Sequence, residues 1–225
     1  MSKIVTGAWR TAETGPMQVV SGPIGRERVH FEAPHADLLP KEMRRFFDWF
    51  ENPALKLDPV MKAGIAHFWF VTIHPFEDGN GRIARAVADL ALARSDQTKQ
   101  RFYSMSAQIR IERNVYYDTL EACQKGSLDI TPWLDWFLAC LGRAIGNSAV
   151  MLETVLTKAR FWEGHAAANF NDRQKLMLNR LLDGFDGKLT SSKWAALAKC
   201  SQDTALRDID DLLKPTSDAS PPPAA

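Results

Sequence analysis

The first part of the chain places β-branched residues on both sides of a turn. Between Met17 and Phe31, the turn-forming residues Ser21–Gly25 separate two such runs. This pattern predicts a β-hairpin with a long tip. A hairpin alone is only marginally stable in water, so we expect it to lie against another part of the chain.

The next two segments have the apolar spacing of helices. Residues 37–51 carry apolar side chains among charges and predict an amphipathic helix. Asp58 and Pro59 then supply an N-cap and a first helical residue. This second helix is expected to run from residue 60 to about 73, because Pro75 ends it. It is apolar on nearly all sides, which is typical of a helix enclosed by others.

The remaining periodic segments predict further helices. In the first 163 residues these helices cover residues 81–95, 106–124 and 131–160. After a small polar stretch we expect three short helices. Asp172 is predicted to cap the first, the second to begin at Thr190 or Ser191, and Ser201 to cap the third. The tight turn between the last two is typical of a helix-turn-helix.

The predicted fold class is therefore all-α, with one β-hairpin on a helical core. We expect the core domain to span residues 1–163 and a small helix-turn-helix-like domain to span residues 164–214. The Pro-rich residues 215–225 have the composition of a disordered tail.

Composition narrows the classes of function. The 28 Lys and Arg residues nearly balance the 27 Asp and Glu residues, so no global field favours nucleic acid or a membrane surface. Residues 202–213 contain four Asp against Arg207 alone, which argues against duplex DNA as a partner. The three cysteines show no CxxC spacing and predict neither a disulfide framework nor a zinc site. The apolar run at 60–73 is too short to cross a membrane, and we expect a cytoplasmic protein.

The stretch from His74 to Arg85 brings together groups suited to phosphate chemistry. Gly79, Asn80 and Gly81 at a helix start would present backbone N–H groups to an anion. Arg82 and Arg85 are three residues apart and project from the same side of the helix. Cations there oppose the helix dipole at a cost of roughly 0.3–1 kcal/mol each. A bound di- or triphosphate would explain both arginines.

Two further side chains complete the chemistry. Asp78 could hold Mg²⁺, which is typically bound by one or two carboxylates plus phosphate oxygens. A neutral His74 could take a proton from an incoming hydroxyl. Taken singly, such a histidine more often bonds to the backbone at a helix end, and a Gly-Asn-Gly is more often only a turn. The combination predicts phosphate-ester transfer.

This stretch, HPFEDGNGRIAR, fits the signature HPFx[D/E]GNGRxxR of the Fic family at every fixed position, so the chain resembles that family over about residues 5–163. Other segments resemble Fic-domain landmarks: Thr6–Arg10, Val19–Phe31, Tyr103–Ser106, Tyr116–Tyr117 and Asp129–Trp133. The last helices resemble the winged-helix appendage of some bacterial members.

The resemblance implies transfer of AMP from ATP to a hydroxyl of a target protein, with Mg²⁺ and release of pyrophosphate. In this sequence it implies that His74 is the general base and Asp78 the Mg²⁺ ligand. It implies that Gly79, Asn80 and Gly81 form the anion hole, and that Arg82 and Arg85 clamp the phosphates. Phe76 would anchor the loop in the core. The adenine pocket would be lined by Tyr116, Tyr117 and Gln124. The hairpin would be a flap that holds the target by β-strand addition.

Regulation and alternative activities follow from the same resemblance. Many Fic proteins are inhibited by a helix carrying [S/T]xxxE[G/N], whose Glu pairs with the second motif arginine. In this sequence Glu163 and Gly164 could match the end of this motif, but Ala159 occupies the position, four residues before the Glu, that requires Ser or Thr. We therefore expect activity unless a partner supplies the glutamate.

Three other functions agree less well with the sequence. Removal of AMP and phosphoryl transfer fit less well, since the GNGR segment is intact and the inhibitory Glu is missing. A nucleotide sensor without turnover would not need His74. The small C-terminal domain could pack on the core or on a second copy in a homodimer.

Overall fold

The computed structural model describes residues 7–23, 25–96, 101–127 and 129–214. The chain divides into two compact units, residues 1–148 and 149–225, with the division inside helix α6 (Thr131–Gly164). Each unit is described by itself. The predicted tail, residues 215–225, lies outside the described residues.

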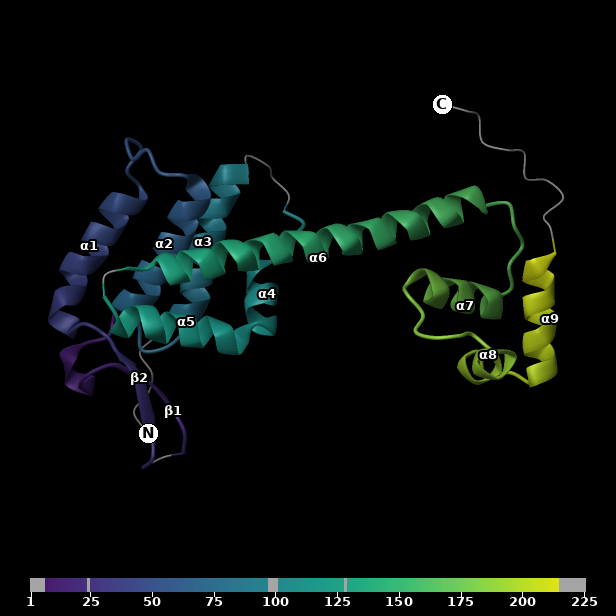
Figure 1. Ribbon diagram of the computed structural model, residues 1–225, viewed down its shortest axis with the longest axis horizontal. Coiled ribbons are helices and arrows are strands. Elements are labelled where there is room, and N and C mark those ends of the chain that lie inside the picture. Colours follow the sequence, from purple (N-terminus) through teal and green to yellow (C-terminus); the bar gives the residue numbers. More distant parts are fainter. Residues whose placement is uncertain (1–6, 24, 97–100, 128, 215–225) are drawn as a thin grey trace. The chain divides into compact units, whose positions relative to one another are not determined.

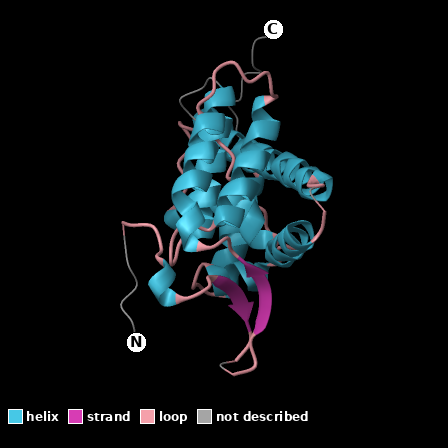
Figure 2. Cartoon of the chain, turned by 90° about the vertical axis from the view of Figure 1, so that its left-hand side faces the viewer, coloured by secondary structure: helices cyan, strands magenta, loops and turns pink. Residues whose placement is uncertain are grey.

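Unit 1 is a set of helices with a β-hairpin at one end (Figures 1 and 2), as the sequence predicts. Across the described residues, no helix is both long and apolar enough to span a membrane. The elements of this unit are η1 (Ala12–Thr14), β1 (Gln18–Ser21), β2 (Arg28–Glu32), η2 (Ala36–Leu38), α1 (Leu39–Phe50), α2 (Pro59–Ile73), α3 (Asn80–Asp96), α4 (Met105–Ile111), α5 (Arg113–Lys125) and the first part of α6.

Helix α2 is enclosed, as its sequence predicts. It begins where the Asp58 carboxylate accepts hydrogen bonds from the N–H groups of Val60 and Met61 at 2.9 and 3.0 Å, which satisfies two donors of the first turn. Gly64 allows α6 to come close, because a Cβ there would lie 3.1 Å from the Phe137 ring. The Trp133 indole donates to the Gly64 carbonyl at 2.9 Å.

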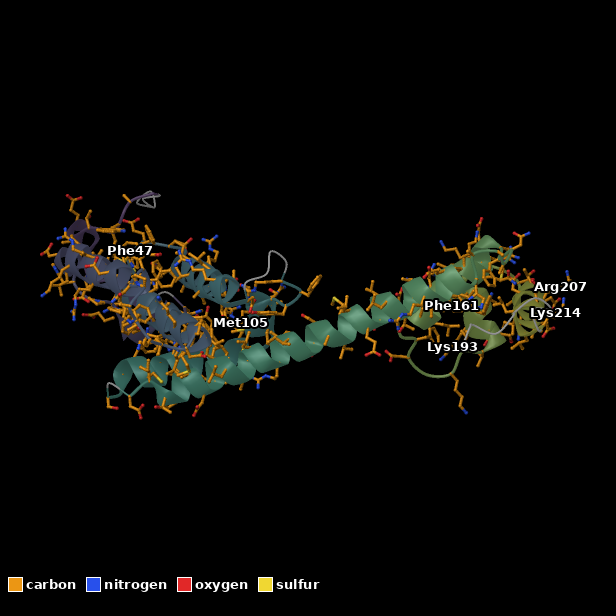
Figure 3. The ribbon with its side chains drawn as sticks, turned by 90° about the horizontal axis from the view of Figure 1, so that it is seen from above. Phe47, Met105, Phe161, Lys193, Arg207 and Lys214 are labelled. Atoms are coloured by element: carbon orange, nitrogen blue, oxygen red, sulfur yellow. The ribbon has the colours of Figure 1, made fainter. Side chains whose placement is uncertain are left out.

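The core of unit 1 contains one buried imidazole. His67 is fully buried, and its Nε2 lies 3.0 Å from the Tyr116 hydroxyl. Burial lowers the pKa of His67 to about 3, so the ring is neutral and behaves as a core residue. Apolar side chains from α1, α2, α3 and α6 fill the space around it, and Met105 at the start of α4 is buried with them (Figure 3).

The hairpin is tied to helix α5. Strands β1 and β2 are antiparallel, with Val19 opposite Phe31 and an irregularity after Val19. The Glu121 carboxylate of α5 contacts His30 Nδ1 at 2.5 Å and accepts from Arg28 at 2.9 Å. Hydrogen bonds from Lys125 and His30 lower the pKa of Glu121 to about 2. The expectation that the hairpin lies against another part of the chain is confirmed.

One predicted helix is divided in the structure. The sequence predicts a single helix over residues 106–124, whereas α4 and α5 are separated at Glu112, whose φ is −97° and ψ is 25°. The Glu112 carboxylate accepts from Arg143 of α6 at 2.6 and 2.5 Å. Because this partner is far away in the sequence, no local signal marks the break.

Unit 2 holds the last turns of α6 and three short helices, α7 (Asp172–Leu182), α8 (Ser191–Leu197) and α9 (Gln202–Leu213). Met177, Trp194 and Ala205 form its small core. The sequence predicts these helices, with one correction: Asn171 rather than Asp172 caps α7, because its side chain accepts from the Gln174 N–H in a capping box.

The predicted domain boundary lay after residue 163, at the end of α6. The units divide earlier, inside that helix, since its last turns contact α7. There Lys158 binds Asp183 at 2.8 Å, and the Trp162 indole donates to Asn179 at 3.1 Å.

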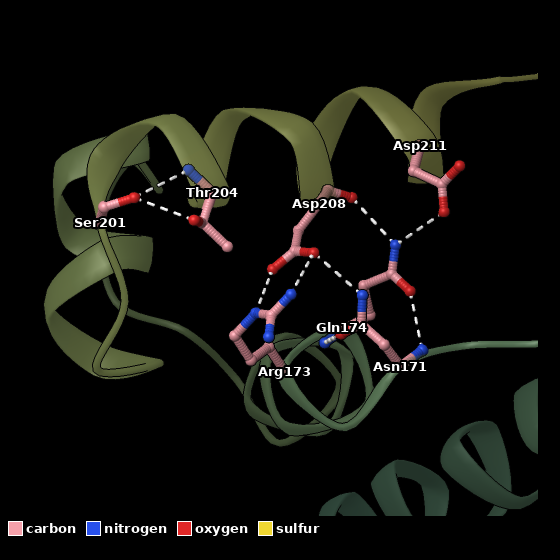
Figure 4. A network of polar contacts seen from close by, with 7 residues as sticks. All are labelled: Asn171, Arg173, Gln174, Ser201, Thr204, Asp208 and Asp211. Atoms are coloured by element: carbon pink, nitrogen blue, oxygen red, sulfur yellow. Dashed lines mark hydrogen bonds and ion pairs between the residues drawn. The ribbon is translucent and has the colours of Figure 1, made fainter.

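A polar network joins α7 to α9 (Figure 4). Arg173 donates to both oxygens of Asp208 at 2.7 and 3.0 Å, and Asn171 donates to the same carboxylate at 2.9 Å. Gln174 bridges the Asp208 carbonyl and the Asp211 carboxylate, both at 3.1 Å. Hydrogen bonds from Arg173 hold the pKa of the buried Asp208 carboxyl below its usual value. Two of the aspartates that argued against DNA binding are therefore structural.

Replacing this carboxylate tests the network. We expect Asp208→Asn to lower the opening free energy of α7 and α9 by about 2 kcal/mol, because Arg173 and Asn171 lose acceptors in a buried place. Hydrogen exchange of the slowest amides of α7 and α9 measures it. Asp210→Asn is the control, since Asp210 is an exposed residue of the same helix. Equal effects of the two substitutions would contradict the assignment.

Candidate active site

The loop between α2 and α3 is closed by the side chain of Asn80. This residue is 2% exposed. Its Oδ1 accepts from the Phe76 N–H at 2.9 Å, and its Nδ2 donates to the Phe76 carbonyl at 2.8 Å. Gly79 adopts a φ of 85°, which favours glycine. The Asn80 side chain thus shapes the loop from which α3 begins.

Arg10 holds the other side of this loop. It is 4% exposed, and its Nε donates to the His74 carbonyl at 2.8 Å. Its guanidinium also donates to the carbonyls of Pro34 and Ile73, and its own N–H donates to the Pro75 carbonyl at 2.9 Å. Sequence reasoning gave Arg10 no role beyond its place in the landmark Thr6–Arg10.

His74 ends α2 in a left-handed conformation, with φ 51° and ψ 58°. A histidine in this conformation carries strain on the order of 1 kcal/mol. The hydrogen bond from Arg10 to the His74 carbonyl helps to keep the backbone in this conformation. The His74 Nδ1 lies 3.1 Å from the Val71 carbonyl. Because a carbonyl only accepts, Nδ1 carries the proton and Nε2 is the acceptor. Burial lowers the pKa of His74, so the imidazole is neutral near pH 7.

A cavity of about 740 Å³ brings the predicted site residues together. It is lined by the hairpin and by the ends of α2, α3 and α5. Among its lining residues are His74, Asp78, Gly79, Asn80, Gly81, Arg82, Arg85, Tyr116, Tyr117 and Gln124. Phe76 is the exception: its ring packs on the core, 6.4 Å from that of Phe70, in agreement with the predicted loop anchor.

The three residues assigned to an adenine pocket differ in what they offer. Tyr116 is 2% exposed and its hydroxyl is engaged by His67, so it forms only part of the wall. Tyr117 is 49% exposed and presents a ring to the cavity. Gln124 donates to the Thr72 hydroxyl at 3.0 Å, which leaves its amide oxygen for another donor.

The predicted metal ligand and the first phosphate clamp pair with each other. Arg82 donates to Asp78 at 2.9 Å, and both side chains are exposed. In the described part of the chain, no group of three or more His, Cys, Asp and Glu side chains could hold a metal. A single carboxylate fits Mg²⁺ only where phosphate oxygens and waters supply the other ligands. Asp78 lines the cavity in which such a phosphate would have to bind.

Comparisons with known proteins agree with the motif and the fold. Residues 1–92 match the sequence model of the Fic/DOC family. The chain is 32% identical over 96 residues to "Protein adenylyltransferase fic-1" of Caenorhabditis elegans and 33% identical over 114 residues to "Protein adenylyltransferase Fic" of Nematostella vectensis. These matches cover 42% and 50% of this chain but 18% and 25% of the relatives.

A solved structure extends the likeness. The crystal structure of a Fic family protein from Desulfovibrio desulfuricans G20 matches 96% of this chain and 61% of its own, with a TM-score of 0.55 and 26% identity. These findings support a Fic family protein. The chain spans about a quarter or less of the length of the curated relatives named above.

The role of Arg10 in holding this loop can be tested by measuring the stability of unit 1 and the pKa of His74. We expect Arg10→Met to destabilise unit 1 by about 3 kcal/mol, because several carbonyls lose a charged donor. The pKa of His74 should rise towards its ordinary value of 6.5, since the Arg10 charge and burial both lower it. Denaturant unfolding and an NMR titration of the imidazole protons measure these effects.

The exposed Arg44 of α1 supplies the control. Arg44→Gln should leave both the stability and the His74 titration unchanged. An unchanged His74 pKa in Arg10→Met would show that Arg10 does not position this loop.

Proposed function

We propose that the chain transfers AMP from ATP to a hydroxyl side chain of a target protein and releases pyrophosphate. The observation that carries this proposal is the placement of His74 Nε2, a proton acceptor, in the cavity that also holds the start of α3 and both motif arginines. Relatives named as protein adenylyltransferases support the same activity.

The chemistry assigns a task to each group. His74 Nε2 takes the proton of the target hydroxyl, and the hydroxyl oxygen bonds to the α-phosphorus. At the same time the bond between the α-phosphorus and the oxygen that bridges to the β-phosphate breaks, and pyrophosphate leaves. The Val71 carbonyl, which accepts from Nδ1, stabilises the imidazolium that forms. Backbone N–H groups at the start of α3 bind the growing negative charge.

The arginines and the acidic residue neutralise the phosphates. Arg82 and Arg85 line the cavity on the α3 side and suit bidentate contacts with phosphate oxygens. Mg²⁺, held by Asp78 and phosphate oxygens, would supply further neutralisation. The Asp78 carboxylate must then leave Arg82, and this frees the guanidinium for phosphate.

The hairpin provides a place for the target. Residues 17–21 line the same cavity as His74. In the described part of the chain, β1 pairs only with β2, so its other edge can accept an extended segment. Main-chain hydrogen bonds would hold that segment beside the base without requiring one sequence.

Labelled nucleotide tests the reaction. With ATP labelled at the α-phosphate, we expect protein-bound label; with ATP labelled at the γ-phosphate we expect none, because the β- and γ-phosphates leave together. The chain is incubated with MgCl₂, either alone or with a lysate whose kinases have been inactivated by heat. Label from the γ-position alone would refute AMP transfer. ATP binding without label from either position would favour a sensor.

The base is tested by substitution. We expect His74→Ala to abolish transfer and to keep ATP affinity within about tenfold, since the imidazole acts on the hydroxyl rather than on the nucleotide. Isothermal titration with ATP and the α-label assay measure the two effects. A substitution that removes ATP binding and transfer together would take His74 out of the role of base.

A further inference from the structure

A second cavity, of about 480 Å³, lies beside the first and is lined by four arginines. Two of them, Arg82 and Arg85, belong to the motif of α3. The others are Arg110, near the end of α4, and Arg113, the first residue of α5. The remaining lining residues are Ser106, Ile109, Tyr116 and Tyr117.

In the part of the chain that the structure describes, three of these four cations have no acidic partner. Among the described residues, no carboxylate forms an ion pair with Arg85, Arg110 or Arg113. Glu112, the acidic residue nearest in the sequence to Arg110 and Arg113, is already engaged by Arg143 and Gln108. Glu112 is thus paired with Arg143 of α6 and does not neutralise the arginines of the cavity.

Their positions add to the positive potential. Arg82 and Arg113 lie in the first turns of their helices, where the helix dipole is already positive. The Arg113 guanidinium lies 5.6 Å from the centre of the Tyr117 ring, a cation–π contact that orients the group without neutralising it. Such a cluster is stabilised by an anion with several charges.

The two cavities share a wall. Arg82, Arg85, Arg113 and both tyrosines line each of them. A nucleotide whose α-phosphate lies at the start of α3 can therefore extend its remaining phosphates past Arg85 towards Arg113 and Arg110. An AMP molecule whose phosphate lies at the start of α3 has no further phosphate to place there.

We propose that Arg110 and Arg113, which lie outside the signature, bind the β- and γ-phosphates of ATP and hold the leaving pyrophosphate. This inference rests on the proposed function, because it takes the first cavity as the place of the α-phosphate. It makes the second cavity the part of the site that distinguishes nucleoside triphosphates from monophosphates.

Inorganic pyrophosphate and AMP are the probes for this assignment. In isothermal titrations we expect Arg110→Gln and Arg113→Gln each to weaken pyrophosphate binding about tenfold or more, as for the loss of a charge-assisted hydrogen bond. AMP affinity should stay within about twofold. Arg44→Gln removes one charge outside both cavities and should change neither affinity. Thermal unfolding of each variant checks that the fold is retained.

Unchanged pyrophosphate affinity in both variants would overturn the inference, and so would an equal loss of AMP and pyrophosphate affinity. The proposed function can fail separately. If the intact chain transfers no α-label while its pyrophosphate binding depends on Arg110 and Arg113, AMP transfer is refuted and the pyrophosphate site remains. If α-label is transferred and neither variant affects pyrophosphate, only this inference fails.

Discussion

The loop from His74 to Asn80 is held from two sides, and the rest of the site depends on this. Arg10 donates to the His74 carbonyl from one side, and Asn80 closes on the backbone of Phe76 from the other. Both side chains are buried, so their hydrogen bonds meet little competition from water. The imidazole, the start of α3 and the motif arginines owe their common arrangement to these contacts.

Ion pairs and their absence explain the charge balance around the arginines of the site. Asp78 balances Arg82 at the surface, while Glu112 is taken up by Arg143. Of the remaining guanidinium groups in the second cavity, that of Arg113 lies over the Tyr117 ring. Such an arrangement stores unfavourable charge repulsion that an anionic ligand relieves, as is common at sites prepared for phosphate.

Local signals in the sequence were sufficient for most elements. Asp58 and Pro59 mark the start of α2, Pro75 marks its end, and the β-branched runs mark the hairpin. The motif likewise predicted the site residues from His74 to Arg85. Long-range contacts could not be predicted: the break at Glu112 follows from Arg143, and the grouping of Arg110 with Arg85 follows from the packing of α4 near α3. For Asn80 the motif indicated the backbone, whereas the structure shows that the side chain closes the loop.

Helix α5 links the two halves of the large cavity. Its Glu121 holds the hairpin through His30 and Arg28, and its Tyr117 and Gln124 line the part assigned to the nucleotide. A displacement of α5 would therefore move both the residue that holds the hairpin and the residues assigned to the nucleotide. If a ligand in one half of the cavity shifts α5 and so changes affinity in the other half, the second ligand must change the affinity of the first by the same factor. Under the proposed function, occupancy of the nucleotide pocket would then change the affinity of β1 for a target segment.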